Sequence, residues 1–184
     1  MANTSLIVVP LDEVRDTDEQ VVGTVVERNG KTYKWIKNAD TTTSLKAKGV
    51  AMYAANDASR TNVYQPNSSS GNGVYYGAGV PVTTIAPAKF GWIQVKGVAS
   101  VSAYQPASAS DLSGAAGVPM VPVTNDTAGY YWHPTSVATV ASELPASIAS
   151  TVRYTGKIIP VAPVTASSGA ASVTTINALV CCME

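Results

Sequence analysis

The chain has 184 residues, with 12 basic and 12 acidic side chains and a charged fraction of 13%, about half the usual share for a globular protein. Its length fits one domain with a sizeable core. Because the charges cancel and Lys and Arg form no dense block, the composition argues against nucleic-acid binding, which requires a concentrated basic face.

The first 20 residues predict an N-terminal arm followed by an acidic connector, ahead of a β domain over residues 21–184. The connector, residues 12–20, lacks the residue order of a calcium loop, and the arm carries the apolar run Leu6, Ile7, Val8 and Val9. The arm has no basic start, and its apolar run is too short for a signal peptide or a membrane span. We therefore expect a protein that stays where it is made and has no membrane partner.

Residues 21–37 predict a β-hairpin. Asn29-Gly30 separates two strand-like runs and favours a two-residue type I′ turn, because both residues take a positive φ at little cost. This turn places Val26 opposite Tyr33 and sets the register of the whole pair. Tyr33 and Trp35 then share one face, and aromatic side chains at strand spacing are more typical of a core than of a binding platform.

The next segment predicts a short strand over residues 45–53 and a long polar loop over residues 56–73. Loops of that length usually have a function, so the loop is a candidate contact surface. Residues 64–83 are weakly repeated in residues 104–124, where Tyr-Gln-Pro occurs a second time. This weak internal repeat suggests a duplicated strand-loop-strand unit.

The strongest strand pattern lies at residues 90–96, where Trp92 and Gln94 alternate with Ile93 and Val95, as in a central strand with two unlike faces. Residues 97–104 either form a separate strand or continue this one past a bend. Further along, residues 172–182 predict an interior strand, whereas the prolines in residues 158–164 predict an edge strand.

These elements predict an all-β fold, either a single-domain β-barrel or a β-sandwich with long Ala/Ser/Gly-rich loops. At most one short helix is expected, within residues 135–150, and Pro145 would end it.

No catalytic or cofactor pattern is present in the sequence. The sequence has a single histidine, His133, and no Gly-x-Ser-x-Gly motif that would supply a nucleophilic serine for it to activate. The Gly-x-Gly pairs at residues 71–73 and 77–79 lead into predicted strands rather than into a phosphate-binding helix. Cys181 and Cys182 are adjacent and do not form a zinc spacing with His133, so we expect reduced thiols. We expect no enzyme activity, no metal and no cofactor.

Four segments together resemble small all-β head-associated virion proteins of tailed bacteriophages, the capsid decoration or cement proteins. The segments are residues 23–27, 31–37, 48–53 and 91–97, and the most distinctive piece is Phe-Gly-Trp-Ile-Gln-Val at residues 90–95. The resemblance covers about half of the chain, in its first part.

This resemblance implies a non-enzymatic protein that binds the outside of an assembled capsid and stabilises the lattice. Its partners would be the major capsid protein and copies of itself, and it would be made in the bacterial cytoplasm and reside in the virion. Within this interpretation the candidate partner contacts are Leu6, Ile7, Val8 and Val9, added as a strand to an adjacent subunit. The alternative is a phage tail, fibre or surface module that binds host glycan through Tyr130, Tyr131 and Trp132.

Overall fold

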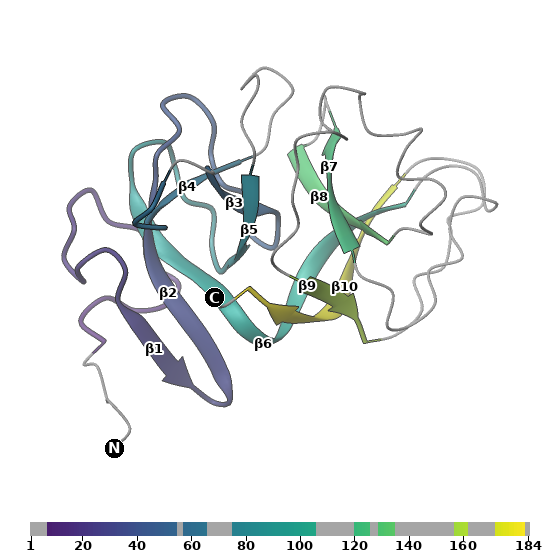
Figure 1. The fold of residues 1–184 in the computed structure, drawn as a ribbon, viewed down its shortest axis with the longest axis horizontal. Coiled ribbons are helices and arrows are strands. Elements are labelled where there is room, and N and C mark those ends of the chain that lie inside the picture. Colours follow the sequence, from purple (N-terminus) through teal and green to yellow (C-terminus); the bar gives the residue numbers. More distant parts are fainter. Residues whose placement is uncertain are drawn as a thin grey trace.

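The protein is all-β and forms a single domain around a closed five-stranded barrel (Figure 1). The computed structural model describes residues 7–54, 57–65, 75–105, 120–125, 129–134, 157–161 and 172–182. Within these residues every regular element is a strand, and no helix is present. The predicted fold class is therefore confirmed, whereas the candidate helix at residues 135–150 lies outside the described residues.

The strands are β1 (Val25–Arg28), β2 (Lys31–Asn38), β3 (Ala51–Ala54), β4 (Asn62–Tyr64), β5 (Tyr75–Pro81), β6 (Phe90–Gln105), β7 (Met120–Asn125), β8 (Gly129–Pro134), β9 (Lys157–Pro160) and β10 (Ser172–Cys181).

The barrel consists of β2, β4, β3, β5 and β6, in that order around the ring. The β2 and β4 strands are parallel, all other neighbours are antiparallel, and β2 closes the ring by pairing with β6. Closure removes the exposed edges that an open sheet would leave. The barrel interior is filled by buried apolar side chains: Ile36, Leu45, Ala51, Tyr53, Val63, Ala78, Ile85, Ile93 and Val95.

The predicted hairpin is confirmed in turn type and in register. Val26 pairs with Tyr33, and Arg28 pairs with Lys31. Asn29 and Gly30 have φ values of 54° and 71°, as a type I′ turn requires. The hairpin therefore follows from local turn chemistry alone.

A second core, which we call the N-terminal core, lies on the outside of the barrel, where the N-terminal segment packs on β1, β2 and β6. Its buried members are Val9, Val26, Tyr33, Trp35 and Trp92. The Trp35 and Trp92 rings meet edge to face at 5.2 Å between centroids, a preferred aromatic geometry. Trp92 Nε1 also donates a hydrogen bond to the Val9 carbonyl at 3.1 Å. Tyr33 and Trp35 are thus core residues, as predicted.

The 16-residue strand β6 links the barrel to the rest of the protein. Its first part pairs with β2 and β5, and its second part pairs along its length with β10. Gly97, with a φ of 94°, lies between these two parts. Residues 97–104 therefore continue the same strand past a bend, and Figure 1 shows β6 running from the hairpin towards β7–β10.

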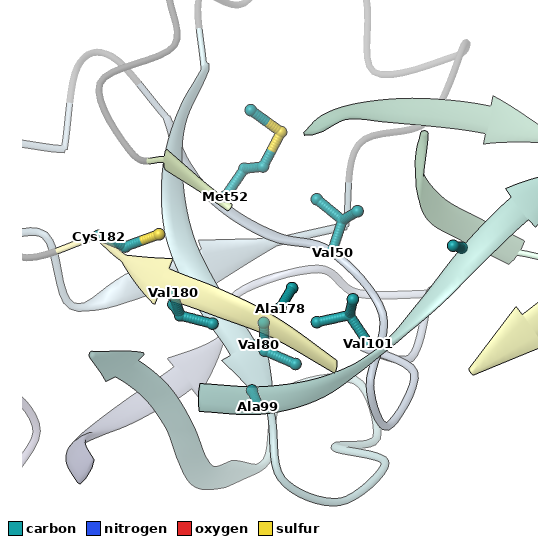
Figure 2. Packing of buried hydrophobic residues seen from close by; sticks show 9 residues of the cluster. Val50, Met52, Val80, Ala99, Val101, Ala178, Val180 and Cys182 are labelled. Atoms are coloured by element: carbon teal, nitrogen blue, oxygen red, sulfur yellow. The ribbon is translucent and has the colours of Figure 1, made fainter. Parts of the chain in front are cut away.

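A third core lies between β10, the second part of β6, and β3 and β5. Figure 2 shows Val80, Ala178, Val180 and Val101 of this core close together, with Val50 and Met52 beside them. The members are Val50, Met52, Val80, Ala99, Val101, Ala103, Ala178, Val180 and Cys182. The prediction that residues 172–182 form an interior strand is confirmed, because β10 lies between β6 and β9. Both cysteines are unbridged thiols.

Three predictions about individual elements were wrong. The strand expected at residues 45–53 is limited to β3, while Leu45 forms only an isolated bridge with Ile85. The expected loop at 56–73 contains β4, three residues that pair with β2 and β3. Strand β9 was expected at a sheet edge but lies between β10 and β7. The prolines do not prevent this position, because β9 contacts β7 at only one residue pair, Met120 and Ile158, and Pro160 is the last residue of the strand.

Replacing Gly79 with alanine should destabilise the barrel. Gly79 has a φ of 149°, and a Cβ there would lie 2.5 Å from the backbone oxygen of Gln94 in the centre of β6. We expect the free energy of unfolding, measured by urea titration, to fall by about 2 kcal/mol or more. The control is Gly30→Ala, where φ is 71° but nothing lies within 4 Å of the added atom, so the loss should be about 1 kcal/mol. Equal losses in the two variants would contradict the steric explanation.

Candidate interaction surfaces

The described part of the chain contains no group of three or more His, Cys, Asp or Glu side chains that could hold a metal ion. Among the same residues, no helix has the length and hydropathy needed to span a bilayer. Large apolar side chains are exposed at several points of the described surface, including Val25 in β1 and Val161 after β9. Two places hold more than one of them, the first near the N-terminus and the second on β6 and β10.

The first place, which we call the N-terminal surface, consists of Val8 and Val21. Their side chains are 59% and 69% exposed. Both lie beside the buried residue Gln20, whose Oε1 accepts hydrogen bonds from the amides of Val8 and Val9 at 2.7 and 3.2 Å. The exposed valines therefore sit on backbone that is bonded to the protein interior.

Val21 is held in an unfavourable backbone conformation. Its φ is 66°, a region that β-branched residues rarely adopt and that costs about 1–3 kcal/mol. Hydrogen bonds on both sides hold it: the Thr24 amide donates to the Val21 carbonyl at 3.0 Å, and the Val22 amide donates to Asp18 Oδ2 at 2.9 Å. An exposed valine is thus kept at a defined position at the expense of local strain.

The acidic connector forms the rim of the N-terminal surface. Asp18 and Glu19 are exposed, and Asp18 Oδ1 also accepts a hydrogen bond from Trp35 Nε1 at 2.9 Å. Lys89 Nζ lies 2.8 Å from Asp16 Oδ1, and the Arg15 backbone bridges Phe90 in β6. Exposed ion pairs contribute little stability, but the backbone and tryptophan bonds attach the connector to the barrel.

The second place, which we call the row surface, runs across β6, β10 and β9. Val98, Leu179 and Ile159 lie directly opposite one another in the strand register, and directly opposed residues point to the same face of a sheet. Val98 and Leu179 are 44% and 43% exposed. On the same face of β10, Val173, Thr175 and Asn177 are also exposed. This face is therefore apolar or uncharged along β10.

A basic group borders one end of the row surface. Lys96 is exposed on β6, two residues from Val98. The hairpin turn reaches the same end, because a Cβ added at Gly97 would lie 3.0 Å from the Gly30 carbonyl and 3.2 Å from Lys31 Cγ. Exposed Arg28 pairs with Lys31 at this turn. Exposed Glu27 lies opposite Thr32 in the same hairpin, so three basic groups and one acidic group gather at this end. On the other rim, Glu19 Oε2 lies 3.4 Å from Arg15 Nε and Asp16 pairs with Lys89, but acidic groups are in excess. The two rims thus differ in the sign of their net charge.

Only part of the predicted partner contact is available for a partner. Val9 is fully buried in the N-terminal core, Ile7 is half-buried against that core, and Val8 is exposed; Leu6 lies outside the described residues. Contact through this arm stays a prediction, and Val8 is the exposed one among the three residues of the run that the structure describes.

The backbone of the predicted aromatic cluster, Tyr130, Tyr131 and Trp132, lies in β8, but its side chains are outside the described ones. Sequence reasoning missed Val21, Val98 and Leu179. Period-2 alternation separates Leu179 from Val180, yet both faces of that strand carry apolar residues, so the pattern gives no sign of which face meets water.

The segment between β3 and β4 contains an acidic group, Asp57, whose pKa is lowered. Asp57 accepts hydrogen bonds from Ser59 Oγ and from the amides of Asn62, Thr61 and Ser59. Partial burial alone raises the pKa of Asp57, but these bonds outweigh it and lower the pKa overall. These partners belong to the loop and to the first residue of β4, so the hydrogen bonds order the loop against the start of that strand.

Lys34 joins this loop to the barrel. Its Nζ donates to the Arg60 carbonyl at 2.8 Å and lies 5.1 Å from the centroid of the Tyr53 ring. Burial lowers the pKa of Lys34 and raises that of Tyr53. The two side chains thus pack the loop onto β2 and β3. The candidate functional features are therefore the two apolar surfaces.

The fold and these surfaces define the class: a single-domain all-β protein with exposed apolar side chains on its surface. Comparison of the chain with protein-family models, with curated proteins and with solved structures finds no match.

Removing the side chain of Gln20 should release the N-terminal arm. In Gln20→Ala the amides of Val8 and Val9 lose their acceptor, so we expect their hydrogen exchange to accelerate and the free energy of unfolding to fall by about 1–3 kcal/mol. The control is Thr17→Ala, on the exposed connector, which should leave both amides protected. Unchanged exchange at Val8 and Val9 in Gln20→Ala would show that the arm is held by other contacts.

Asp57 should make stability depend on pH in the acid range. Its folded-state pKa is lowered, so its contribution is present above the unfolded-state pKa of about 3.9 and is lost as pH falls through the folded-state value. We expect Asp57→Asn to be less stable than the wild type at pH 7 and the difference to shrink below about pH 4. Urea titrations across this range test it, with Asp12→Asn controlling for loss of one charge. A difference that grows towards low pH would contradict this sign.

Proposed function

We propose that this protein is a structural virion protein that binds the outside of an assembled tailed-phage capsid and stabilises the lattice. The observation that carries the proposal is the pair of exposed apolar surfaces on one closed β scaffold. Exposed apolar patches mark sites of contact with other proteins, and two such sites on one small domain suit a component of an assembly.

The scaffold supports this role by holding the contact residues in place. Val98 and Leu179 belong to the paired strands β6 and β10, rather than to loops. The N-terminal surface is attached through Gln20 and Trp92. Contact residues on rigid elements lose little conformational entropy on binding, which favours regular, repeated contacts.

The charge balance also suits a crowded lattice. Twelve basic and twelve acidic side chains cancel, so copies bound close together have no net charge to repel one another. Each contact is small, and many weak contacts acting together supply the stability of a lattice.

The link to phage heads comes from the sequence resemblance. The segments that carry it fall in the β1–β2 hairpin, β3 and the first part of β6, and β2, β3 and β6 are strands of the barrel. On this interpretation the partners are the major capsid protein and copies of the chain, no enzyme activity is involved, and the protein resides in the virion. The alternative, glycan binding through Tyr130, Tyr131 and Trp132, stays a prediction because no described side chain favours it.

Binding to phage heads that lack this protein tests the proposal. Purified protein is mixed with such heads, the heads are sedimented, and bound protein is counted at increasing concentration. We expect saturation at a number set by the lattice, together with greater resistance of the heads to heat, because each added contact stabilises the assembled state.

Heads that already carry the protein are the matched control and should bind no more of it. A chain starting at residue 7 keeps Ile7 and Val9 in the N-terminal core and tests whether Leu6 contributes. If the protein-free heads neither bind the protein nor gain heat resistance, the capsid proposal is wrong.

A further inference from the structure

The two apolar surfaces differ in the charge that borders them. Val8 and Val21 lie beside exposed Asp18 and Glu19, whereas Val98 and Leu179 lie at the end of a sheet face bordered by Lys96. Arg28 and Lys31 at the hairpin turn add to the basic end. In the described part of the chain, Arg28, Lys31 and Lys96 form no ion pair.

The two rims cannot pair with each other within one chain. Asp18 is bonded to Trp35 on β2, and the basic turn begins at Lys31, four residues earlier on that strand. At about 3.3 Å per residue, the backbone positions of Lys31 and Trp35 are about 13 Å apart. This distance exceeds the Debye length of about 8 Å at physiological salt. Figure 1 shows the turn of the hairpin at the end far from the segment that precedes β1.

We propose that the chain associates head to tail, with the N-terminal surface of one copy docked on the row surface of the next. Val8 and Val21 would then be buried against Val98 and Leu179, and Asp18 and Glu19 would face Lys96 and the hairpin turn. Burial of the four apolar side chains supplies the driving force, and the opposite charges set orientation and partner choice. This rests on the part of the proposed function that names copies of the chain as partners.

Charge also argues against pairing either surface with itself. Two N-terminal surfaces would bring four carboxylates together, and two row surfaces would bring lysines to one interface; like charges at an interface are unfavourable. A contact between two different surfaces is heterologous, so it closes into a ring when the rotation between copies allows it. When the rotation does not close, the same contact gives an open chain of copies.

Mass measurements on the free protein test the head-to-tail association without phage heads. Sedimentation equilibrium at about 0.15 M salt should show a concentration-dependent oligomer of the wild-type chain. Lys96→Glu and Glu19→Lys should each weaken association by about tenfold or more, because each places like charges across the contact. The double variant K96E/E19K exchanges the two charges, so it should recover association towards the wild-type level.

Two controls separate this contact from general effects of charge and folding. Lys46→Glu reverses an exposed lysine in the segment before β3 and should associate as the wild type does. Leu179→Ser should weaken association without any change of charge. Thermal unfolding of every variant shows whether it is folded; recovery in the double variant shows in addition that the two charges face each other.

A wild-type chain that stays monomeric at all concentrations would overturn the inference. So would single variants that associate normally, or a double variant that fails to recover. These outcomes are independent of the capsid experiment: a monomeric protein that saturates phage heads refutes only the head-to-tail contact, and an oligomer that ignores the heads refutes only the capsid role.

Discussion

The whole structure depends on β6, which is buried on both faces over residues 91–95 and on one face beyond Gly97. Each core contains residues of this strand: Trp92 lies in the N-terminal core, Ile93 and Val95 in the barrel, and Ala99 and Val101 in the third core. One strand can serve three cores only by bending, and it bends at Gly97, where a Cβ would lie 3.0 Å from the Gly30 carbonyl. Glycine at this point lets the hairpin turn and β6 approach closely.

Both interaction surfaces are positioned by this same strand. Trp92 holds the Val9 carbonyl and thereby the arm that carries Val8, and Val98 lies on β6 itself, next to the bend. A rigid link between two contact surfaces lets one binding event set the geometry of the next. Under the proposed head-to-tail contact, this rigid link would fix the orientation of each copy relative to its neighbour.

Sequence reasoning worked where the determining chemistry is local. Asn29-Gly30 specified the turn and hence the pairing of Val26 with Tyr33, because two-residue turns fix hairpin register. It failed for β4, whose three residues become a strand only by pairing with β2 and β3, far away in the sequence. It also failed for β9, since its contact with β7 is made at a single residue pair.

By itself the sequence determined the all-β class, the hairpin and the central strand at residues 90–96, because φ preferences and period-2 alternation act over a few residues. Only the tertiary structure decided the closure of the barrel and which apolar residues face water. Leu179 and Val180 are equally apolar, but long-range pairing with β6 buries Val180 and leaves Leu179 exposed.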